Sequence, residues 1–321
     1  MSSKPARCLT EKKEKATYRV TNWSSYDEAL VKRGNVTLWF AEEVVVEHWK
    51  PAATGKRGAV TQYSDRAIQM LLTLKAVFSL TYRSVEGFGR SLMQLMGLDL
   101  RIPDHTSLSR RAKTLSVVIP RRSHADPLHI VVDSTGLKLF GEGEWKVRQH
   151  GVSKRRTWIK VHLAVDSAIL DVVSVEVTTP AWTDAEVFDG LIEQIEGDIE
   201  QIDGDGAYDT RAAYETARKR NARLIVPPRD DAVPWEKEHP RTQALAYIAE
   251  RGIKAWKTST NYHQRSLAEN AMYRFKQLLG DGLVSRSFAT QVTEVHVRIA
   301  AMNIMTSLGM PVSVRLGGVA S

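Results

Sequence analysis

Three acidic residues in separate parts of the chain have the sequence surroundings expected of metal ligands. Asp133 follows a short apolar run, Asp205 lies between two glycines after a second one, and Glu269 lies in a stretch with helical periodicity. Carboxylates that meet repel one another unless a cation neutralises them, and oxygen-only ligands suit Mg²⁺ or Mn²⁺. Two such ions held by carboxylates are a device for in-line phosphoryl transfer. The sequence therefore predicts a two-ion catalytic site if the fold brings these residues together.

The segment "YHQRSLAENAMYRFK", residues 262–276, supports this interpretation. At about 100° per residue, Arg265 and Lys276 fall within roughly 40° of Glu269 on a helix, and Tyr262 within about 20°. The opposite side of this helix is apolar and consists of Leu267, Ala271, Phe275 and Leu278. For the helix alone, the simpler interpretation is a solvated face with an Arg265–Glu269 ion pair. Basic side chains beside a metal site would instead neutralise and orient phosphates.

Three aspartates compete for the second position in "IDGDGAYDT". Asp203 falls within the predicted strand and Asp209 falls where a helix cap belongs, whereas Asp205 follows the strand directly. We prefer Asp205, because a ligand is expected at the carboxyl end of its strand, as we also expect for Asp133. For each aspartate taken alone, a turn or cap residue is the better interpretation.

The order of predicted elements indicates how these residues meet. Alternation and apolar runs predict three antiparallel strands first, followed by alternating helices and strands and a final helix. This order is what a ribonuclease-H-like mixed α/β sheet requires, with the final helix across the central strands. The predicted strands are 128–135, 157–166, 171–179, 223–228 and one within the stretch 199–209, and the predicted helices are 182–198, 210–222 and 262–276.

An all-helical region is predicted before this sheet. One helix opens at Ser64 or Asp65, and a second has Ser84 as its candidate N-cap and Gly97 as its candidate C-cap. A further helix at 103–115 has a buried face of Leu108, Ala112 and Leu115, and it carries the basic residues Arg110, Arg111 and Lys113. Two short helices with the second one basic predict a helix-turn-helix-like DNA-binding region. An ordinary helical hairpin with solvated arginines is an equally good interpretation of this pattern alone.

Four regions follow from these patterns. We expect a flexible basic tail at 1–24, the helical DNA-binding region at 25–120, the catalytic domain at 127–310 and a C-terminal tail at 311–321. A linker is predicted at 116–127.

Composition narrows the function classes. The 321 residues are 43% hydrophobic and 26% charged, as in a globular protein, and carry a formal net charge of +8. This excess favours a polyanionic partner, nucleic acid before membrane. The single cysteine, Cys8, excludes a disulfide framework and a CxxC zinc site. No apolar run reaches membrane-spanning length and the start has no signal-peptide pattern, so we expect a cytoplasmic protein.

The chain resembles the DDE transposases of bacterial insertion sequences. The spacing Tyr262, two residues, Arg265, three residues, Glu269, six residues, Lys276 matches their Y-(2)-R-(3)-E-(6)-K signature. The stretch "VVDSTGLKLFGEGEWKVRQHG" resembles the first-aspartate region of the insertion sequence five group, and "DGAYDT" resembles the second. The resemblance covers residues from about 25 to 310.

This resemblance implies a specific activity. Asp133, Asp205 and Glu269 would bind two Mg²⁺ or Mn²⁺ ions and catalyse hydrolysis at the ends of a mobile element, followed by attack of the freed 3'-hydroxyl on target DNA. Tyr262, Arg265 and Lys276 match positions that contact the phosphate backbone near the cleaved end. The N-terminal helices would recognise the terminal inverted repeats in double-stranded DNA, and pairing two ends implies a homodimer or a larger assembly.

Some relatives carry a large insertion before the glutamate-bearing helix. Here only about 35 residues separate the strand at 223–228 from that helix, so any such insertion is small or absent.

Two alternative functions remain open at this stage. A metal-dependent nuclease without strand transfer would use the same three carboxylates. A non-catalytic DNA-binding regulator would have no physical need for them, so the carboxylates weaken that alternative.

Several further residues have two interpretations. The loop residues Lys154, Arg155 and Arg156 either bind DNA phosphates or are simply solvated. His150 and His162 lack metal-ligand spacing. Trp182 and Trp256 either stack on a flipped base or pack within the protein.

Overall fold

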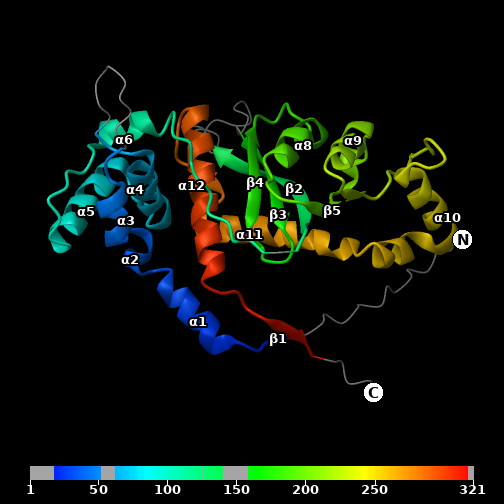
Figure 1. Ribbon diagram of the computed structural model, residues 1–321, viewed down its shortest axis with the longest axis horizontal. Helices are drawn as coiled ribbons and strands as arrows, with labels where there is room; N and C mark the ends of the chain where they lie inside the picture. Colours follow the sequence, from blue (N-terminus) through cyan, green and yellow to red (C-terminus); the bar gives the residue numbers. More distant parts are fainter. Residues whose placement is uncertain (1–17, 52–61, 125, 140–157, 317–321) are drawn as a thin grey trace, which may run out of the picture.

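A six-stranded mixed sheet forms the centre of the protein (Figure 1). The computed structural model describes residues 18–51, 62–124, 126–139 and 158–316. The main path of the sheet has the order β4-β3-β2-β5-β6, and a short strand β7 also pairs with β2. The strands are β2 (Leu128–Leu139), β3 (Trp158–Asp166), β4 (Val172–Thr178), β5 (Ile199–Asp203), β6 (Arg223–Ile225) and β7 (Gly282–Leu283).

The strand directions agree with the sequence prediction. β2, β3 and β4 are antiparallel neighbours, while β5 and β6 run parallel to β2 on its other side. Short turns suffice for antiparallel neighbours, and helical crossovers are needed for the parallel ones. The predicted fold class, mixed α/β with a ribonuclease-H-like core, is confirmed.

Strand β2 is longer than predicted, and this corrects the position of Asp133. The strand does not end near Asp133, because its pairing with β3 continues as far as Lys138 opposite Trp158. On the other side of β2, β5 pairs only as far as Val131 opposite Asp203, and β7 joins at Lys138. Asp133 therefore lies in mid-strand, where the sheet is open between the end of β5 and the start of β7.

Helices cover both faces of the sheet (Figure 1). α8 (Asp184–Glu193) and α9 (Arg211–Lys219) bury apolar residues against one face, including Phe188, Ile192 and Ala217. Thr183 is the N-cap of α8 and forms a capping box with Glu186. α11 (Ser266–Leu279) and α12 (Phe288–Ser307) cover the other face.

The N-terminal helices share the core of α11 and α12. They are α1 (Trp23–Lys32), α2 (Val36–Trp39), α3 (Glu42–His48), α4 (Asp65–Val77), α5 (Tyr82–Leu95) and α6 (His105–Arg111). α4 packs against α12, and a single apolar cluster runs from these helices to β2, β3 and β4. The segment predicted as a linker at 116–127 therefore separates two sets of elements but not two cores.

The observed ends of α4 and α5 can be compared with the predicted helix caps. Ser64 caps α4 as predicted. α5 begins earlier than predicted, because Thr81 rather than Ser84 is its N-cap and accepts a hydrogen bond from the Ser84 N–H at 3.2 Å. Gly97, with φ of 67°, follows the end of α5 in the left-handed conformation that favours glycine.

α12 was not predicted from the sequence. Thirteen of its residues are buried, on all sides of the helix, so it has no polar stripe to mark a helical period. Among the described residues, no helix is long and apolar enough to cross a membrane.

The described parts of the two predicted tails form a small second sheet. β1 (Tyr18–Val20) pairs antiparallel with β8 (Ser313–Arg315). Residues 1–17 and 317–321 of the predicted tails lie outside the described residues.

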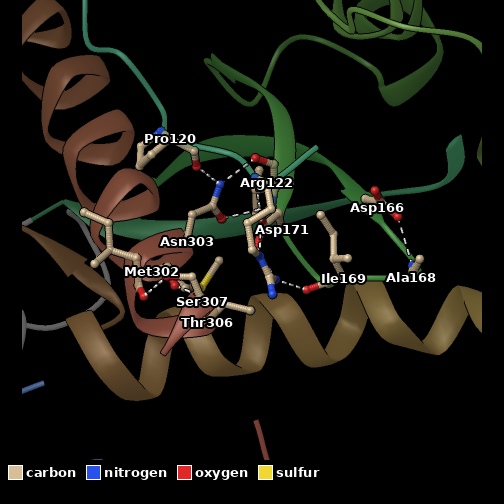
Figure 2. Close-up of polar contacts among 12 residues, drawn as sticks. Pro120, Arg122, Asp166, Ala168, Ile169, Asp171, Met302, Asn303, Thr306 and Ser307 are labelled. Carbon is tan, nitrogen blue, oxygen red and sulfur yellow. Dashed lines mark hydrogen bonds and ion pairs between the residues drawn. The ribbon is translucent and has the colours of Figure 1, made fainter. Parts of the chain in front are cut away.

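A buried amide fastens the segment at 116–127 to the sheet and to α12. Figure 2 shows Asn303 of α12 between Pro120 and the turn that joins β3 to β4. Its amide nitrogen donates to the carbonyls of Pro120 at 2.9 Å and Val172 at 2.8 Å, and its oxygen accepts from the Val172 N–H at 2.9 Å. Beside it, Arg122 forms an ion pair with the buried Asp171 at 2.8 Å.

Asn303→Leu is expected to lower the free energy of unfolding by about 3 kcal/mol, because it leaves buried backbone groups without partners. Urea unfolding of both proteins measures this difference. Ser307→Ala, an exposed change on the same helix, is the control and should cost less than about 0.5 kcal/mol. Equal costs for the two variants would show that the amide does not hold this junction.

Candidate active site

The three predicted carboxylates come from three elements that meet at the opening beside β2. Asp133 lies on the face of β2 that α11 covers, since its neighbour Val131 packs in that core. Asp205 comes two residues after the end of β5, whose last residue is paired with Val131. Glu269 lies in the first turn of α11, which crosses β2 and β3. The charges of Asp205 and Glu269 both act on Asp133, so the three residues form one electrostatic unit.

Arg265 lies between two of these carboxylates. Its Nη1 donates to Glu269 Oε1 at 2.6 Å, and its Nη2 donates to Asp133 Oδ2 at 3.4 Å. The Arg265–Glu269 pair expected of a solvated helix face is therefore present, but the same guanidinium also reaches the sheet. It is a cation held where carboxylates from a strand and a helix converge.

Full ionisation of all three carboxylates is electrostatically unfavourable at this site. Burial raises the pKa of Asp133, and the charges of Asp205 and Glu269 raise it further, against the Ser134 N–H and Arg265. For Arg265, burial lowers the pKa, but Asp133, Tyr262 and Glu269 outweigh it and the net shift is upward. Both shifts show that this place favours positive charge.

The residues present fit hard divalent cations. The donor set is three carboxylates, and a guanidinium, that of Arg265, is bound to two of them. In the part of the chain that the structure describes, no group of three metal-ligating side chains converges closely enough to hold an ion without movement. Because mutual repulsion keeps unneutralised carboxylates apart, we expect Arg265 to give way when ions bind.

Asp133→Asn is expected to raise the melting temperature of the metal-free protein near pH 7. Since the folded-state pKa of Asp133 is raised above its ordinary value of 3.8, its ionised form disfavours folding at neutral pH. This penalty is absent below the unfolded pKa, so the two melting curves should converge as the pH falls toward that value. Thermal unfolding in chelator across this range tests the sign. Asp230→Asn, an exposed change, is the control. If Asp133→Asn were less stable than wild type at every pH, the ionised form of Asp133 would not be destabilising.

The other two aspartates of the second region have different partners. Asp203 is buried and accepts hydrogen bonds from His129 at 3.0 Å and Gln201 at 2.9 Å. Asp209 is buried and bound by Arg241, and Thr210 rather than Asp209 caps α9. Asp205 is half-buried, and within the described residues it forms no ion pair. Its Oδ1 accepts only the Ala207 N–H at 2.9 Å, so it is the member of the three that is available to a ligand.

The loop that carries Asp205 is held by a close contact. A Cβ on Gly204 would come within 2.7 Å of the Tyr208 ring and 3.2 Å of Val132, so glycine is required there. Tyr208 is buried and its ring packs on Phe188 of α8 at 5.4 Å. Burial raises the pKa of Tyr208, and the charges of Asp184, Asp133 and Asp205 act in the same direction.

Tyr262 is placed differently from the sequence prediction. It begins a 3₁₀ turn, η2 (Tyr262–Arg265), which follows α10 (Pro240–Ser259) and leads into α11. Tyr262 is therefore not in line with Glu269 on one α-helix. Its ring is 8% exposed and lies 5.7 Å from Trp256. Burial raises the pKa of Tyr262 to about 12, so it remains a neutral hydroxyl beside the carboxylates.

The remaining signature residue, Lys276, lies two turns beyond Glu269 on the same flank of α11 and is half-buried. A hydrogen bond from Lys138 is the main cause that lowers the pKa of Asp281, and the charge of Lys276 lowers it further.

The buried side of α11 differs slightly from the predicted one. Its buried residues are Ala268, Ala271, Met272, Phe275 and Leu279, whereas Leu267 and Leu278 are only half-buried.

The predicted DNA contacts of α6 divide into two kinds. Arg110 and Lys113 are exposed. Arg111 instead donates to the Tyr63 carbonyl at 3.0 Å and pairs with Asp65 at 2.5 Å, so it fastens α6 to α4. The predicted contacts Lys154, Arg155 and Arg156 lie outside the described residues, as does His150.

Sequence reasoning missed a polar cluster on the opposite face of β2 and β3. Asp184 lies 3.0 Å from Lys160 Nζ and 3.1 Å from His162 Nδ1, and His162 Nε2 contacts Thr178 Oγ1 at 2.9 Å. The signal was present, since Lys160 and His162 alternate with the apolar residues of an otherwise buried strand. His162 is buried among these partners and, as predicted, is a strand-face residue.

The two tryptophans singled out from the sequence differ in exposure. Trp256 is 4% exposed and packs on Tyr262, whereas Trp182 is 52% exposed. Packing therefore accounts for Trp256.

Comparison with known proteins identifies the family. Residues 124–304 match a family model described as "Transposase DDE domain", and residues 31–142 match a second model of the same description. These two matches together include Asp133, Asp205 and Glu269.

The comparison with solved structures finds transposase complexes at low structural similarity. The piggyBac transposase synaptic complex with hairpin DNA is 11% identical, with a TM-score of 0.40, and the match covers 87% of this chain and 74% of that one. The Mos1 transposase paired-end complex with left transposon end is 10% identical, with a TM-score of 0.22 and coverage of 74% and 84%. The Mos1 mariner paired-end complex with Mn is 13% identical, with a TM-score of 0.21 and coverage of 76% and 86%. Because the family match at residues 124–304 spans more than half of the chain, this protein belongs to the DDE transposase family and is a DDE-type transposase.

Proposed function

We propose that this transposase binds the terminal inverted repeats of an insertion sequence, cleaves the DNA at the ends of the element and joins the freed 3'-hydroxyls to target DNA. The observation that carries the proposal is that Arg265 bridges Asp133 and Glu269, while the charges of Asp205 and Glu269 both act on Asp133. The spacing of Tyr262, Arg265, Glu269 and Lys276 supports a transposase of a bacterial insertion sequence, and the stretch around Asp133 supports membership of the insertion sequence five group.

The three carboxylates would hold two Mg²⁺ or Mn²⁺ ions. When bound, such ions activate the attacking oxygen and stabilise the leaving one. The protein's own contribution is to fix the donors: Asp133 on a central strand, Asp205 on a loop held by Gly204 and Tyr208, and Glu269 on a packed helix. Rigid elements keep the reacting groups in line, which is a large part of catalysis in phosphoryl transfer.

The basic residues beside the carboxylates would bind the phosphates of the cleaved strand. Arg265, released from Asp133 and Glu269, presents a planar fork that suits a phosphate, while Lys276 adds a point charge farther along the same flank. Tyr262 is buried, so we assign it to positioning: its ring sets the start of η2 against Trp256 and thereby the direction of Arg265.

We also propose that the end of α6 and the turn after it bind the terminal repeats through Arg110 and Lys113. Arg110→Ala and Lys113→Ala are each expected to reduce the slope of log affinity against log salt by about 1, since each removes one phosphate contact. DNA binding measured at several salt concentrations tests this. Arg111→Ala should instead lower the melting temperature, because Arg111 joins α6 to α4. Unchanged salt dependence in the Arg110 and Lys113 variants would remove α6 from the DNA interface.

One experiment tests the proposed reaction as a whole. Purified protein, Mg²⁺ and labelled DNA with candidate terminal repeats are incubated with a target plasmid, and nicked, hairpin and joined products are scored. Joined products in which the 3'-end is linked to target DNA support the proposal. Metal-dependent nicks with no joined product would favour the nuclease alternative, and binding without either product would favour a regulator. The mass of the DNA-bound complex tests the proposed pairing of two protomers.

A further inference from the structure

The outer face of α11 is exposed and almost without charge. Ser266, Asn270, Tyr273 and Gln277 lie along it, and Tyr273 is 65% exposed. On one flank of this face are Arg265 and Lys276, which belong to the proposed catalytic site. At about 100° per residue, Arg274 falls roughly 140° from Glu269, so it lies on the other flank. α11 therefore presents a neutral, hydrogen-bonding face with cations on both sides.

Arg274 is largely buried beside a second arginine. Its Nη2 donates to Thr306 Oγ1 of α12 at 2.9 Å. Burial lowers the pKa of Arg274, and the charge of Arg33, at the end of α1, lowers it further. The Arg33 guanidinium lies 6.0 Å from the Tyr26 ring, and its Nε is buried with no hydrogen-bond partner among the described residues.

The carboxylate that acts on Arg274 already has another partner. The charge of Asp171 raises the pKa of Arg274, but Asp171 is already bound to Arg122 (Figure 2). It accepts hydrogen bonds from the Arg122 backbone N–H at 2.9 Å, from Nε at 3.1 Å and from Nη2 at 2.8 Å. Within the described part of the chain, neither Arg33 nor Arg274 forms an ion pair. Arg122 and Arg274 thus share one carboxylate, and the charge of Arg33 acts on Arg274 as well. Half-buried cations that repel each other are costly unless an anion joins them, and paired arginines match a phosphate.

We propose that Arg33 and Arg274 bind a backbone phosphate of the DNA strand that is not being cleaved, with the outer face of α11 in the major groove between the two strands. An α-helix is about 10–12 Å across with its side chains, and the major groove is about 12 Å wide, whereas the minor groove is too narrow for it. Arg265 and Lys276 then lie on the cleaved strand and the arginine pair on the complementary one. Asn270 and Gln277 face the base edges, where amide side chains pair with adenine. This inference rests on the proposed binding of element ends.

The two arginines could instead have a purely structural role. The backbone carbonyls at the carboxyl end of α12 attract cations, so positive side chains there would stabilise the helix. That role predicts a loss of stability rather than a loss of DNA affinity. The two roles are separated by variants that remove charge and by DNA in which single phosphates are neutral.

The test compares Arg33→Gln, Arg274→Gln and the conservative Arg274→Lys with wild type. The control is Arg218→Gln, an exposed change on α9 at the opposite face of the sheet. Duplexes that carry the terminal repeat, each with one methylphosphonate at a successive position of the uncleaved strand, are measured for binding in chelator. At one position, the methylphosphonate should weaken wild-type binding about tenfold. Arg274→Gln should bind the unmodified duplex about tenfold more weakly than wild type, and the methylphosphonate at that position should cause it no further loss. Arg274→Lys should lie between, and the control should match wild type.

The inference would be overturned if the methylphosphonate at every position weakened the binding of Arg274→Gln as much as that of wild type. It would also be overturned if the arginine variants had a lower melting temperature but unchanged DNA affinity. If wild type shows no preference for terminal-repeat DNA, the proposed function fails and this inference fails with it. If wild type binds and cleaves such DNA while both arginine variants bind equally well, only this inference is refuted.

Discussion

Glu269→Gln is expected to bind terminal-repeat DNA as tightly as wild type and to cleave it at least about 10³-fold more slowly. Removing a single group that stabilises developing charge costs roughly 10²–10³ in rate, and loss of a metal ligand adds to that cost. Glutamine has nearly the same shape as glutamate and keeps one oxygen, so the start of α11 should be unchanged. Binding should survive because Glu269 is a carboxylate, which repels rather than attracts phosphates.

Two measurements on the same DNA separate these effects: affinity in chelator and the cleavage rate in excess protein with Mg²⁺. Glu193→Gln, an exposed change on α8 at the other face of the sheet, should match wild type in both. A tenfold or smaller loss of cleavage in Glu269→Gln would mean that the carboxylate is an ion-pair partner of Arg265 and not a metal ligand.

Arg241→Met is expected to cost about 3–5 kcal/mol of stability, the range for a buried ion pair that loses one partner. Arg241 Nε lies 2.9 Å and 3.0 Å from the two oxygens of Asp209, and its Nη1 donates to the Val233 carbonyl. Both side chains are buried. The change leaves the Asp209 carboxylate in an apolar place, four residues after Asp205, with the Arg229 N–H at 3.3 Å as its remaining donor. The loop that carries Asp205 should loosen, so cleavage should fall as well.

Urea unfolding of Arg241→Met, Asp209→Leu and the double variant measures the interaction. The double variant should be more stable than the sum of the single losses predicts, because no unpaired charge remains. Arg251→Gln, which removes an exposed pair with Glu250, should cost less than about 0.5 kcal/mol. Strictly additive losses would show that Asp209 and Arg241 do not stabilise each other.

Local sequence patterns were sufficient for most of the sheet. The alternation of Ile159, Val161, Leu163 and Val165 identified β3 and the apolar face that it turns toward α11 and α12, because successive side chains of a strand point to opposite faces. The helix α8 was predicted within residues 182–198, because its apolar residues recur with a helical period. Such features depend on neighbours in the chain and need no knowledge of the fold.

Features that depend on distant partners were not predictable in the same way. The end of β2 was misplaced because pairing with β3 and β7, rather than the residues after Asp133, decides where the strand stops. α12 was missed because burial on all sides removes the polar stripe. Asp209 was interpreted as a cap because its partner, Arg241, lies on a helix that the sequence did not reveal.

The candidate site shows the same division. The resemblance and the spacing selected Asp133, Asp205 and Glu269, and the register of β2 with β5 then accounts for how the two aspartates come level. The bridging position of Arg265 and the burial of Tyr262 follow from packing between α10, η2 and the sheet, which helical spacing alone does not contain.

The most direct test of the central claim is a crystal structure of the protein with terminal-repeat DNA and Mn²⁺, with the ions located by anomalous scattering. We predict two Mn²⁺ ions bound by Asp133, Asp205 and Glu269, with Arg265 moved from these carboxylates onto a phosphate of the cleaved strand. Mn²⁺ bound elsewhere, or Arg265 still bridging Asp133 and Glu269 in the DNA complex, would contradict the assignment of these residues as the catalytic metal ligands.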